Sequence, residues 1–266
     1  MGKNPAWSWY ITWYFFIGGV AAGAYLMAAL ADFFGRDRER RVARVGYALA
    51  FPLVVVSAIL LTLDLGMPGR AFNMFRVFNW GSPMSVGSWA LLAFGLVSLA
   101  SLLLVLRDRP GDRRIRQNLA VPGVILGFFI ASYTGVLLGA TNRPVWIGNN
   151  WIGPLFLVSG VSTGMAALVL LRAQPRLGGF RRVHLFSVPL EALLLVLFLL
   201  SLGAGAILFL TGSLAPLFWG GVVVVGLALP FGLTLLPFRD LEAGVAALVL
   251  VGGFTLRYIV LMGGQV

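Results

Sequence analysis

The sequence has no cysteine and only one histidine, His184. Without cysteine it has no disulfide, no thiolate metal site and no iron–sulfur cluster of its own. A single histidine excludes a bis-histidine haem inside a helical bundle. The sequence therefore lacks the ligand sets of the common protein-bound redox centres.

Charge is also scarce, because only 11% of the 266 residues are charged, against about 25% in soluble domains. Hydrophobic residues make up 59% of the chain, and the mean hydropathy is +0.94. These values predict an integral membrane protein. The net charge of +11 is typical of nucleic-acid binders as well, but the positions of the arginines make it a topology signal.

Eight apolar stretches reach the ~20 residues that a membrane-spanning helix needs. The sequence therefore predicts an all-α integral membrane protein with eight transmembrane helices. Their expected ranges are 9–34, 43–66, 84–106, 119–140, 152–171, 184–210, 215–236 and 242–263.

The segments between these stretches alternate in positive charge. One alternate set carries fifteen arginines, whereas the other carries four lysine and arginine residues. Because positive charge is enriched in cytoplasmic loops, we expect the arginine-rich set to lie inside and both termini to lie outside. Two of the outer segments, 67–83 and 141–151, are long enough to form a docking surface for a partner.

A Gly-x-x-x-Gly pattern occurs in both the first and the fifth stretch. It is formed by Gly19 and Gly23 in "GGVAAGAYLMAAL" and by Gly160 and Gly164 in "SGVSTGMAALVLL". Small residues four apart let helix backbones approach closely in lipid. Close packing and a functional role remain equally open for these glycines.

The second and sixth stretches also correspond, with Pro52 matching Pro189. Each half of the sequence has four stretches and begins on the same side, so the repeat is parallel rather than inverted. We therefore expect two four-helix bundles that arose by duplication, at 1–140 and 141–266.

Polar residues are expected to gather at one level near the outer surface. Asp64 ends the second stretch, and at ~1.5 Å per residue Arg257 and Tyr133 both lie roughly 22 Å from the inner surface. The first stretch begins with further polar or amphipathic side chains, Ser8, Trp9, Thr12 and Trp13. Two compatible interpretations remain open: an Asp64–Arg257 ion pair with interfacial anchoring, or a pocket for the polar head of a lipophilic ligand.

Three carboxylates lie toward the inner side. Glu191 stands two residues after Pro189, inside an apolar stretch, and is either a stop on a proton path or a neutral hydrogen-bonding group between helices. Asp32 and Glu242 lie nearer the inner rim, where we expect solvated caps. Asp32 and Asp64 are also candidates for the proton path, together with Glu191.

Four stretches resemble one family: "WSWYITWYFFIGGVAAGAYL" (7–26), "LDLGMPGRAFNMF" (63–75), "WGSPMSVGSW" (80–89) and "SYTGVLLGATNRPVW" (132–146). They are similar to the NrfD/PsrC family, the quinol-interacting membrane subunits of polysulfide-, nitrite- and related reductase complexes. The likeness covers most of the first half, and the second half mainly through its topology.

The resemblance implies an eight-span subunit without haem in a prokaryotic cytoplasmic membrane. It implies electron exchange between a quinone, expected to be menaquinone, and a ferredoxin-like iron–sulfur subunit on the outer face, with a molybdopterin catalytic subunit beyond. By the family pattern Tyr133 hydrogen-bonds a quinone carbonyl, and Asp64 is the acidic residue that ends the second span. Some members have a histidine at the start of the first span, for which Ser8, Trp9, Thr12 or Trp13 would substitute here.

Two other functions remain open on the residues alone. Parallel repeats and buried charges also occur in secondary transporters, whose substrate contacts lie near the membrane midplane. A passive membrane anchor for a soluble enzyme would use the outer segments without binding quinone. The sequence leaves the terminal substrate and the direction of electron flow undetermined.

Overall fold

A computed structural model describes most of the chain: residues 9–35, 39–64, 69, 73, 75–109, 111–141, 143, 145–173, 178–236 and 241–265, with the backbone only at 178–180. The described residues form helices and no strand, and eight helical segments are long and apolar enough to cross a membrane. The helical elements are α1 Trp9–Phe34, α2 Arg40–Asp64, α3 Pro83–Arg107, α4 Asp112–Gly139, α5 Ile152–Leu170, α6 Gly178–Leu202, η3 Gly203–Ala206, α7 Ile207–Leu210, η4 Leu217–Ala228, α8 Leu229–Leu235 and α9 Glu242–Gly263.

The expected eight spans are confirmed, and three of them differ in detail from the expectation. α4 begins seven residues before the expected position 119, because its arginine-rich first turns pack against α1 instead of forming a loop. The sixth span extends from Arg181 to Leu210 through the 3₁₀ turn η3, where Gly203 adopts a positive φ of 56°. The seventh span begins as the π-helix η4 and continues as α8.

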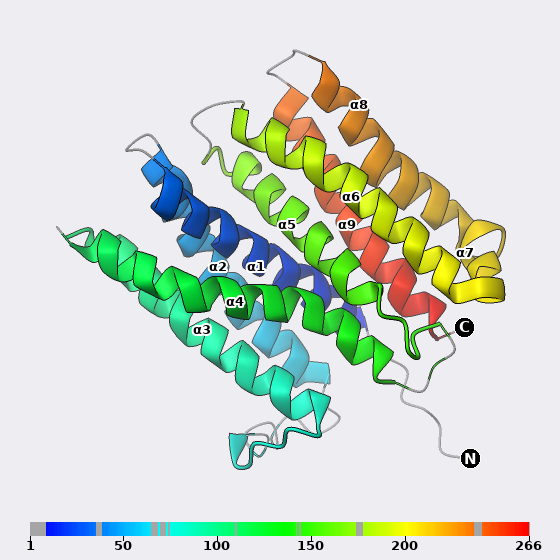
Figure 1. Cartoon of the computed structure of the whole chain (residues 1–266), viewed down its shortest axis with the longest axis horizontal. Coiled ribbons are helices and arrows are strands. Elements are labelled where there is room, and N and C mark those ends of the chain that lie inside the picture. The colour runs from blue at the N-terminus through cyan, green and yellow to red at the C-terminus, as the bar shows by residue number, and fades with distance from the viewer. Residues whose placement is uncertain are drawn as a thin grey trace.

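Helices α1 and α5 occupy the middle of the molecule (Figure 1). α1 packs against α2, α4, α5 and α9, and α5 packs against α4, α6 and α9 as well. α3 completes the first group of helices through its contacts with α2 and α4. The two central helices therefore connect the first four spans with the last three.

The glycines of the two Gly-x-x-x-Gly patterns make the contact between α1 and α5. A Cβ atom on Gly160 would lie 3.2 Å from the backbone oxygen of Gly19, and one on Gly164 would lie 2.5 Å from the backbone nitrogen of Ala24. A side chain at Gly23 would overlap the carbonyl of Gly160. Close helix packing, one of the two alternatives that the sequence left open, is therefore what these residues do.

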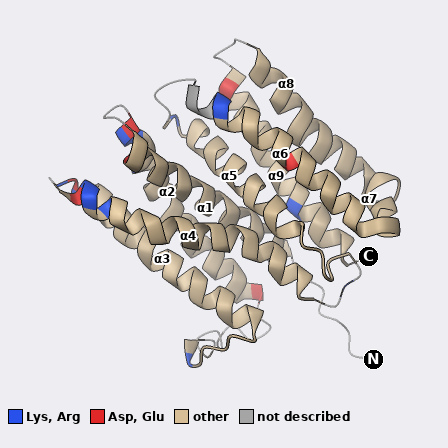
Figure 2. Ribbon diagram, in the orientation of Figure 1, with Lys and Arg blue, Asp and Glu red and all other residues tan. Residues whose placement is uncertain are grey.

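The helices have two distinct ends. α1 begins and α9 ends at one of them, which we call the termini face, and most of the described Lys and Arg residues gather at the opposite one, the arginine face (Figure 2). α2, α4, α6 and α9 run from the arginine face to the termini face. On the positive-inside rule, the arginine face is the one expected in the cytoplasm.

Candidate functional site

Tyr133 is held at the termini end of the first four helices. It lies on α4, is 6% exposed, and packs its ring against Gly87 of α3, where any side chain would overlap it. Its hydroxyl donates to the carbonyl of Pro83, at the start of α3, and its ring stacks on Phe129 at 5.3 Å. Tyr133 is therefore fixed in orientation between two helices.

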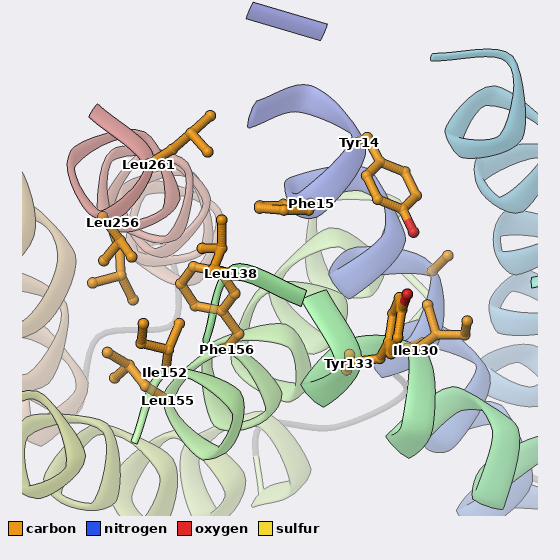
Figure 3. Packing of buried hydrophobic residues seen from close by; sticks show 14 of the residues in the cluster. Tyr14, Phe15, Ile130, Tyr133, Leu138, Ile152, Leu155, Phe156, Leu256 and Leu261 are labelled. Carbon is orange, nitrogen blue, oxygen red and sulfur yellow. The ribbon is translucent and has the colours of Figure 1, made fainter. Parts of the chain in front are cut away.

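Tyr14 of α1 faces Tyr133. It is 1% exposed, and Figure 3 shows its hydroxyl pointing toward that of Tyr133, with which it interacts electrostatically. Tyr14 was not among the predicted site residues, although its spacing to Gly18, Ala21 and Tyr25 marks one buried helix face.

Ser57 of α2 lies beside Gly18 of α1, one helical turn along α1 from Tyr14. Its side chain is fully buried, and its hydroxyl has no hydrogen-bond partner among the residues that the structure describes. A Cβ on Gly18 would come 3.6 Å from that hydroxyl, so the glycine leaves room beside it. An unsatisfied buried hydroxyl is unfavourable by ~1–3 kcal/mol, so Ser57, like the buried hydroxyls of Thr12 and Ser98, can still take a hydrogen-bond partner. We call Tyr14, Ser57, Gly87 and Tyr133 the four-helix site, since each of α1 to α4 supplies one residue.

An apolar groove of about 290 Å³ lies between α2 and α3, and we call it the α2–α3 groove. Its size is at the lower end of that of small-molecule pockets, which are mostly apolar with a few polar groups. Ser88, the neighbour of Gly87, lines it, and Asp64 lies just beyond it, two residues after Thr62. The lining residues are Phe51, Val54, Val55, Ala58, Leu61, Thr62, Phe75, Ser88, Leu91, Leu92, Gly95, Leu96 and Leu99.

The residues predicted at the start of the first span lie on another face of α1. The ring centroid of Trp13 lies 4.6 Å from that of Phe254 on α9. The ring centroid of Trp9 lies 5.8 Å from that of Phe254 and 5.3 Å from that of Tyr258. Successive side chains on a helix point about 100° apart. Trp13 therefore points away from the four-helix site, although it directly precedes Tyr14. Ser8 lies outside the described residues.

Thr12 is fully buried, and its hydroxyl has no hydrogen-bond partner within the described part of the chain. It stands two residues before Tyr14, which places the two side chains about 200° apart around α1. Thr12 thus provides a buried polar group near the termini face, on a different side of α1 from the four-helix site.

Arg257 is fully buried between α1, α5 and α9. Its guanidinium donates to the carbonyls of Phe15 (3.1 Å), Phe156 (3.2 Å) and Gly253 (2.8 Å), and to the hydroxyl of Ser159 (3.1 Å). The carboxylate whose charge it faces is Glu191 of α6 rather than Asp64. Of the two interpretations offered for these residues, the ion pair with Asp64 is thus wrong, because α9 directs Arg257 toward α5.

Glu191 is 7% exposed and interacts with Ser159 and with Arg257. Together with Ser159 and Thr163 it lines a cavity of about 10 Å³ between α5, α6, η4 and α9. A cavity of this size holds about one water molecule. Glu191 therefore belongs to a buried polar cluster that links the helices on both sides of α5.

Asp32 is not a solvated cap, which corrects the expectation from its position at the rim. It is 4% exposed and accepts two hydrogen bonds from Arg116 of α4, at 2.9 and 3.0 Å. Its backbone carbonyl also accepts from Arg113 and Gln117. The sequence predicts that Asp32 lies near a helix end. It does not predict that Arg116, from another span, pairs with it.

Comparison with known proteins gives one family over the whole chain. The model of the family described as "Polysulphide reductase, NrfD" matches residues 1–266. The C subunit of the polysulfide reductase of Wolinella succinogenes is 29% identical, over 99% of this chain and 95% of that protein. Protein NrfD of Escherichia coli is 27% identical, over 99% and 96%. The "Hdr-like menaquinol oxidoreductase integral membrane subunit" of Archaeoglobus fulgidus is 24% identical, over 57% and 38%.

Proposed function

Since this chain belongs to the polysulphide reductase NrfD family of oxidoreductase membrane subunits, we propose that it exchanges electrons between a membrane quinone and an iron–sulfur partner. The observation that carries the proposal is the facing pair of Tyr14 and Tyr133 in the four-helix site, with the buried hydroxyl of Ser57 beside Gly18 and an apolar groove between α2 and α3. This combination suits a molecule with a polar ring and a long apolar tail.

In this proposal the α2–α3 groove takes the isoprenoid tail and the four-helix site takes the ring of the quinone. Ser57 donates to or accepts from a ring oxygen, because its hydroxyl has no other partner among the described residues. Tyr133 already donates to Pro83, so its oxygen remains an acceptor for a quinol hydroxyl. Tyr14 is the second phenol at the same level. The Archaeoglobus relative is named as a subunit of a menaquinol oxidoreductase, which supports menaquinone as the quinone type.

Asp64 ends α2 at the termini face, beyond the groove, and we assign it the transfer of the proton released by the quinol. Glu191 and Asp32 are buried and lie farther toward the arginine face, and we keep them as candidates for proton movement from that face. Asp32 is neutralised by Arg116, so a proton passing there would have to break a two-fold hydrogen bond. Glu191 lies on a cavity for about one water and is thus the better placed of the two.

The partner is expected on the termini face, which in this proposal lies outside the cytoplasmic membrane. That face exposes large apolar side chains, including Trp80 (84%), Val77 (72%) and Ile147 (55%). Aromatic residues of this kind are enriched at protein–protein interfaces. A ferredoxin-like iron–sulfur subunit bound there would receive the electrons, and a molybdopterin catalytic subunit beyond it would use them.

The two rival functions have less support from the geometry. A secondary transporter needs a substrate site near the midplane, where the Glu191 cavity has room for about one water. A passive anchor accounts for the exposed termini face but gives no role to the facing tyrosines or to the α2–α3 groove. Quinone binding therefore separates the proposed function from both rivals.

The test is Tyr133→Phe in membranes that contain this protein with its partner subunits. We expect quinol-dependent reduction of the partner to fall at least ~10-fold, since the variant loses a hydrogen-bonding group at the ring. Tyr25→Phe is the matched control, because Tyr25 is a buried tyrosine that bonds Ser101 deeper in the same bundle. Full quinol activity of Tyr133→Phe, with normal assembly, would refute the site.

A further inference from the structure

A pocket of about 400 Å³ opens at the arginine face of the first four helices. It is formed by the start of α2, the end of α3 and the start of α4, and we call it the basic pocket. Five arginines and one aspartate are among its lining residues, so the lining carries an excess of positive charge. The charged residues are Arg40, Arg44, Asp108, Arg109, Arg113 and Arg116.

Two of these arginines are held in place by the surrounding structure, and a third makes an exposed ion pair. Arg116 is fixed by Asp32, Arg113 donates to the carbonyls of Asp32 and Gly35, and Arg44 is paired with Asp108 at 2.7 Å. A guanidinium has five N–H groups, so these bonds leave further donors on each side chain. Because these side chains are already ordered, they lose less conformational entropy when an anion binds.

The backbone adds to this positive field. α4 is 28 residues long and begins at the pocket; its N-cap Gly111 makes no side-chain cap, and the carboxylate of Asp112 in its first turn accepts from the backbone N–H of Arg109 and offsets part of the helix charge. The N-terminus of a long helix favours anions through its N–H groups and its dipole. The guanidinium groups are the main attraction that the basic pocket offers to a phosphate, since arginine forms charge-assisted hydrogen bonds with phosphate oxygens.

We propose that the basic pocket binds the phosphate headgroup of an anionic phospholipid. A phosphate ester is the shared chemistry of a lipid and a soluble phosphate, and the helix ends around the pocket favour the lipid. Leu103 and Leu106 of α3 are 56% and 68% exposed, and Ile115 of α4 is 50% exposed, which gives acyl chains an apolar surface next to the headgroup. Basic pockets between transmembrane helices on the cytoplasmic side bind such headgroups.

The test measures how much phosphatidylglycerol the full-length protein retains after exchange into phosphatidylcholine, by native mass spectrometry. Arg40 and Arg109 are exposed lining residues, and Arg40→Gln with Arg109→Gln should lower retention roughly 25-fold, at about fivefold per lost charge. Arg181→Gln with Arg182→Gln removes the same charge from the arginine end of α6 and should change retention little. Arg40→Lys with Arg109→Lys should keep most of the binding and shows that the fold tolerates change there.

Two outcomes would overturn the proposal. Equal loss in the Arg181/Arg182 variant would mean that surface charge, not the pocket, holds the lipid. Stabilisation of the detergent-solubilised protein by inorganic phosphate, absent in the Arg40/Arg109 glutamine variant and as large as that by phosphatidylglycerol, would assign the pocket to a soluble phosphate. The measurement does not depend on quinone chemistry, so its failure would leave the proposed function untouched.

Discussion

Two arginines are buried among the described residues, and the fold satisfies them in different ways. Arg116 meets one carboxylate, Asp32, through two hydrogen bonds, so the charge is neutralised within the first group of helices. Arg257 instead donates to three carbonyls and one hydroxyl from α1, α5 and its own helix, and faces the carboxylate of Glu191. Arg116 thus forms an ion pair between two helices. Arg257 joins α1, α5 and α9, and we call its set of contacts the Arg257 junction.

The difference shows which buried charge joins the two halves of the protein. α1 belongs to the first half, whereas α5, α6 and α9 belong to the second, and Arg257 contacts or faces all of them. Gly19 provides the space, since a Cβ atom there would lie 2.6 Å from a guanidinium nitrogen. Arg257 therefore stabilises the central α1–α5 contact, while Arg116 fixes the arginine end of α1 against α4.

The largest effect is expected for Arg257→Met. The change removes every donor of the junction and leaves Glu191 buried without its opposing charge, so we expect a loss of about 3–5 kcal/mol in stability. Thermal unfolding of the detergent-solubilised protein measures it. Arg257→Lys keeps the charge but has three donors instead of five. It should therefore lose some stability, but less than Arg257→Met. Near-normal stability of Arg257→Met would show that the carbonyls do not need this arginine.

A smaller effect is expected for Asp32→Asn. The amide cannot accept both hydrogen bonds from Arg116, so a buried guanidinium loses its counter-charge, which we expect to destabilise the protein by about 2–3 kcal/mol. Combining it with Arg116→Gln should restore part of the loss, since no unpaired charge then remains. Strictly additive effects in this double-mutant cycle would contradict a direct pair.

The sequence predicts the spans well because span length and apolar composition are local properties. The first stretch, expected at 9–34, is α1 from Trp9 to Phe34, and the last, expected at 242–263, is α9. Arginine content likewise marks the ends of the helices before any packing is known. These features need no information about which helix lies beside which.

The candidate site could be predicted only in part, because partners across helices depend on how each helix is rotated. Depth along the membrane places Asp64, Tyr133 and Arg257 at one level, yet Arg257 points toward α5 and Glu191. Tyr14 follows Trp13 directly, but the helix sends them to opposite neighbours, α4 and α9. Rotation about the helix axis is set by tertiary packing, which composition and spacing do not specify.

The glycine contact that supports the Arg257 junction should be sensitive to one methyl group. Gly164→Ala places a Cβ 2.5 Å from the backbone nitrogen of Ala24, so α1 and α5 must separate, and we expect a loss of about 1–3 kcal/mol. Gly244→Ala is the matched control, because a Cβ there meets nothing within 4 Å and alanine favours the helix. Equal unfolding temperatures for the two variants would contradict the close contact.

The smallest effect is expected at the exposed pair of Arg44 and Asp108, which has the same chemistry as Arg116 and Asp32. Its side chains are 60% and 62% exposed, and exposed ion pairs stabilise by only about 0.2–1 kcal/mol. Asp108 has a φ of 45°, which asparagine tolerates, so Asp108→Asn isolates the charge. We expect almost unchanged thermal unfolding but greater phosphatidylglycerol retention, because a carboxylate of the pocket lining is removed. A smaller loss of stability in Asp108→Asn than in Asp32→Asn would then be explained by burial rather than by the pairing itself. Equal losses of stability in the two variants would refute that explanation.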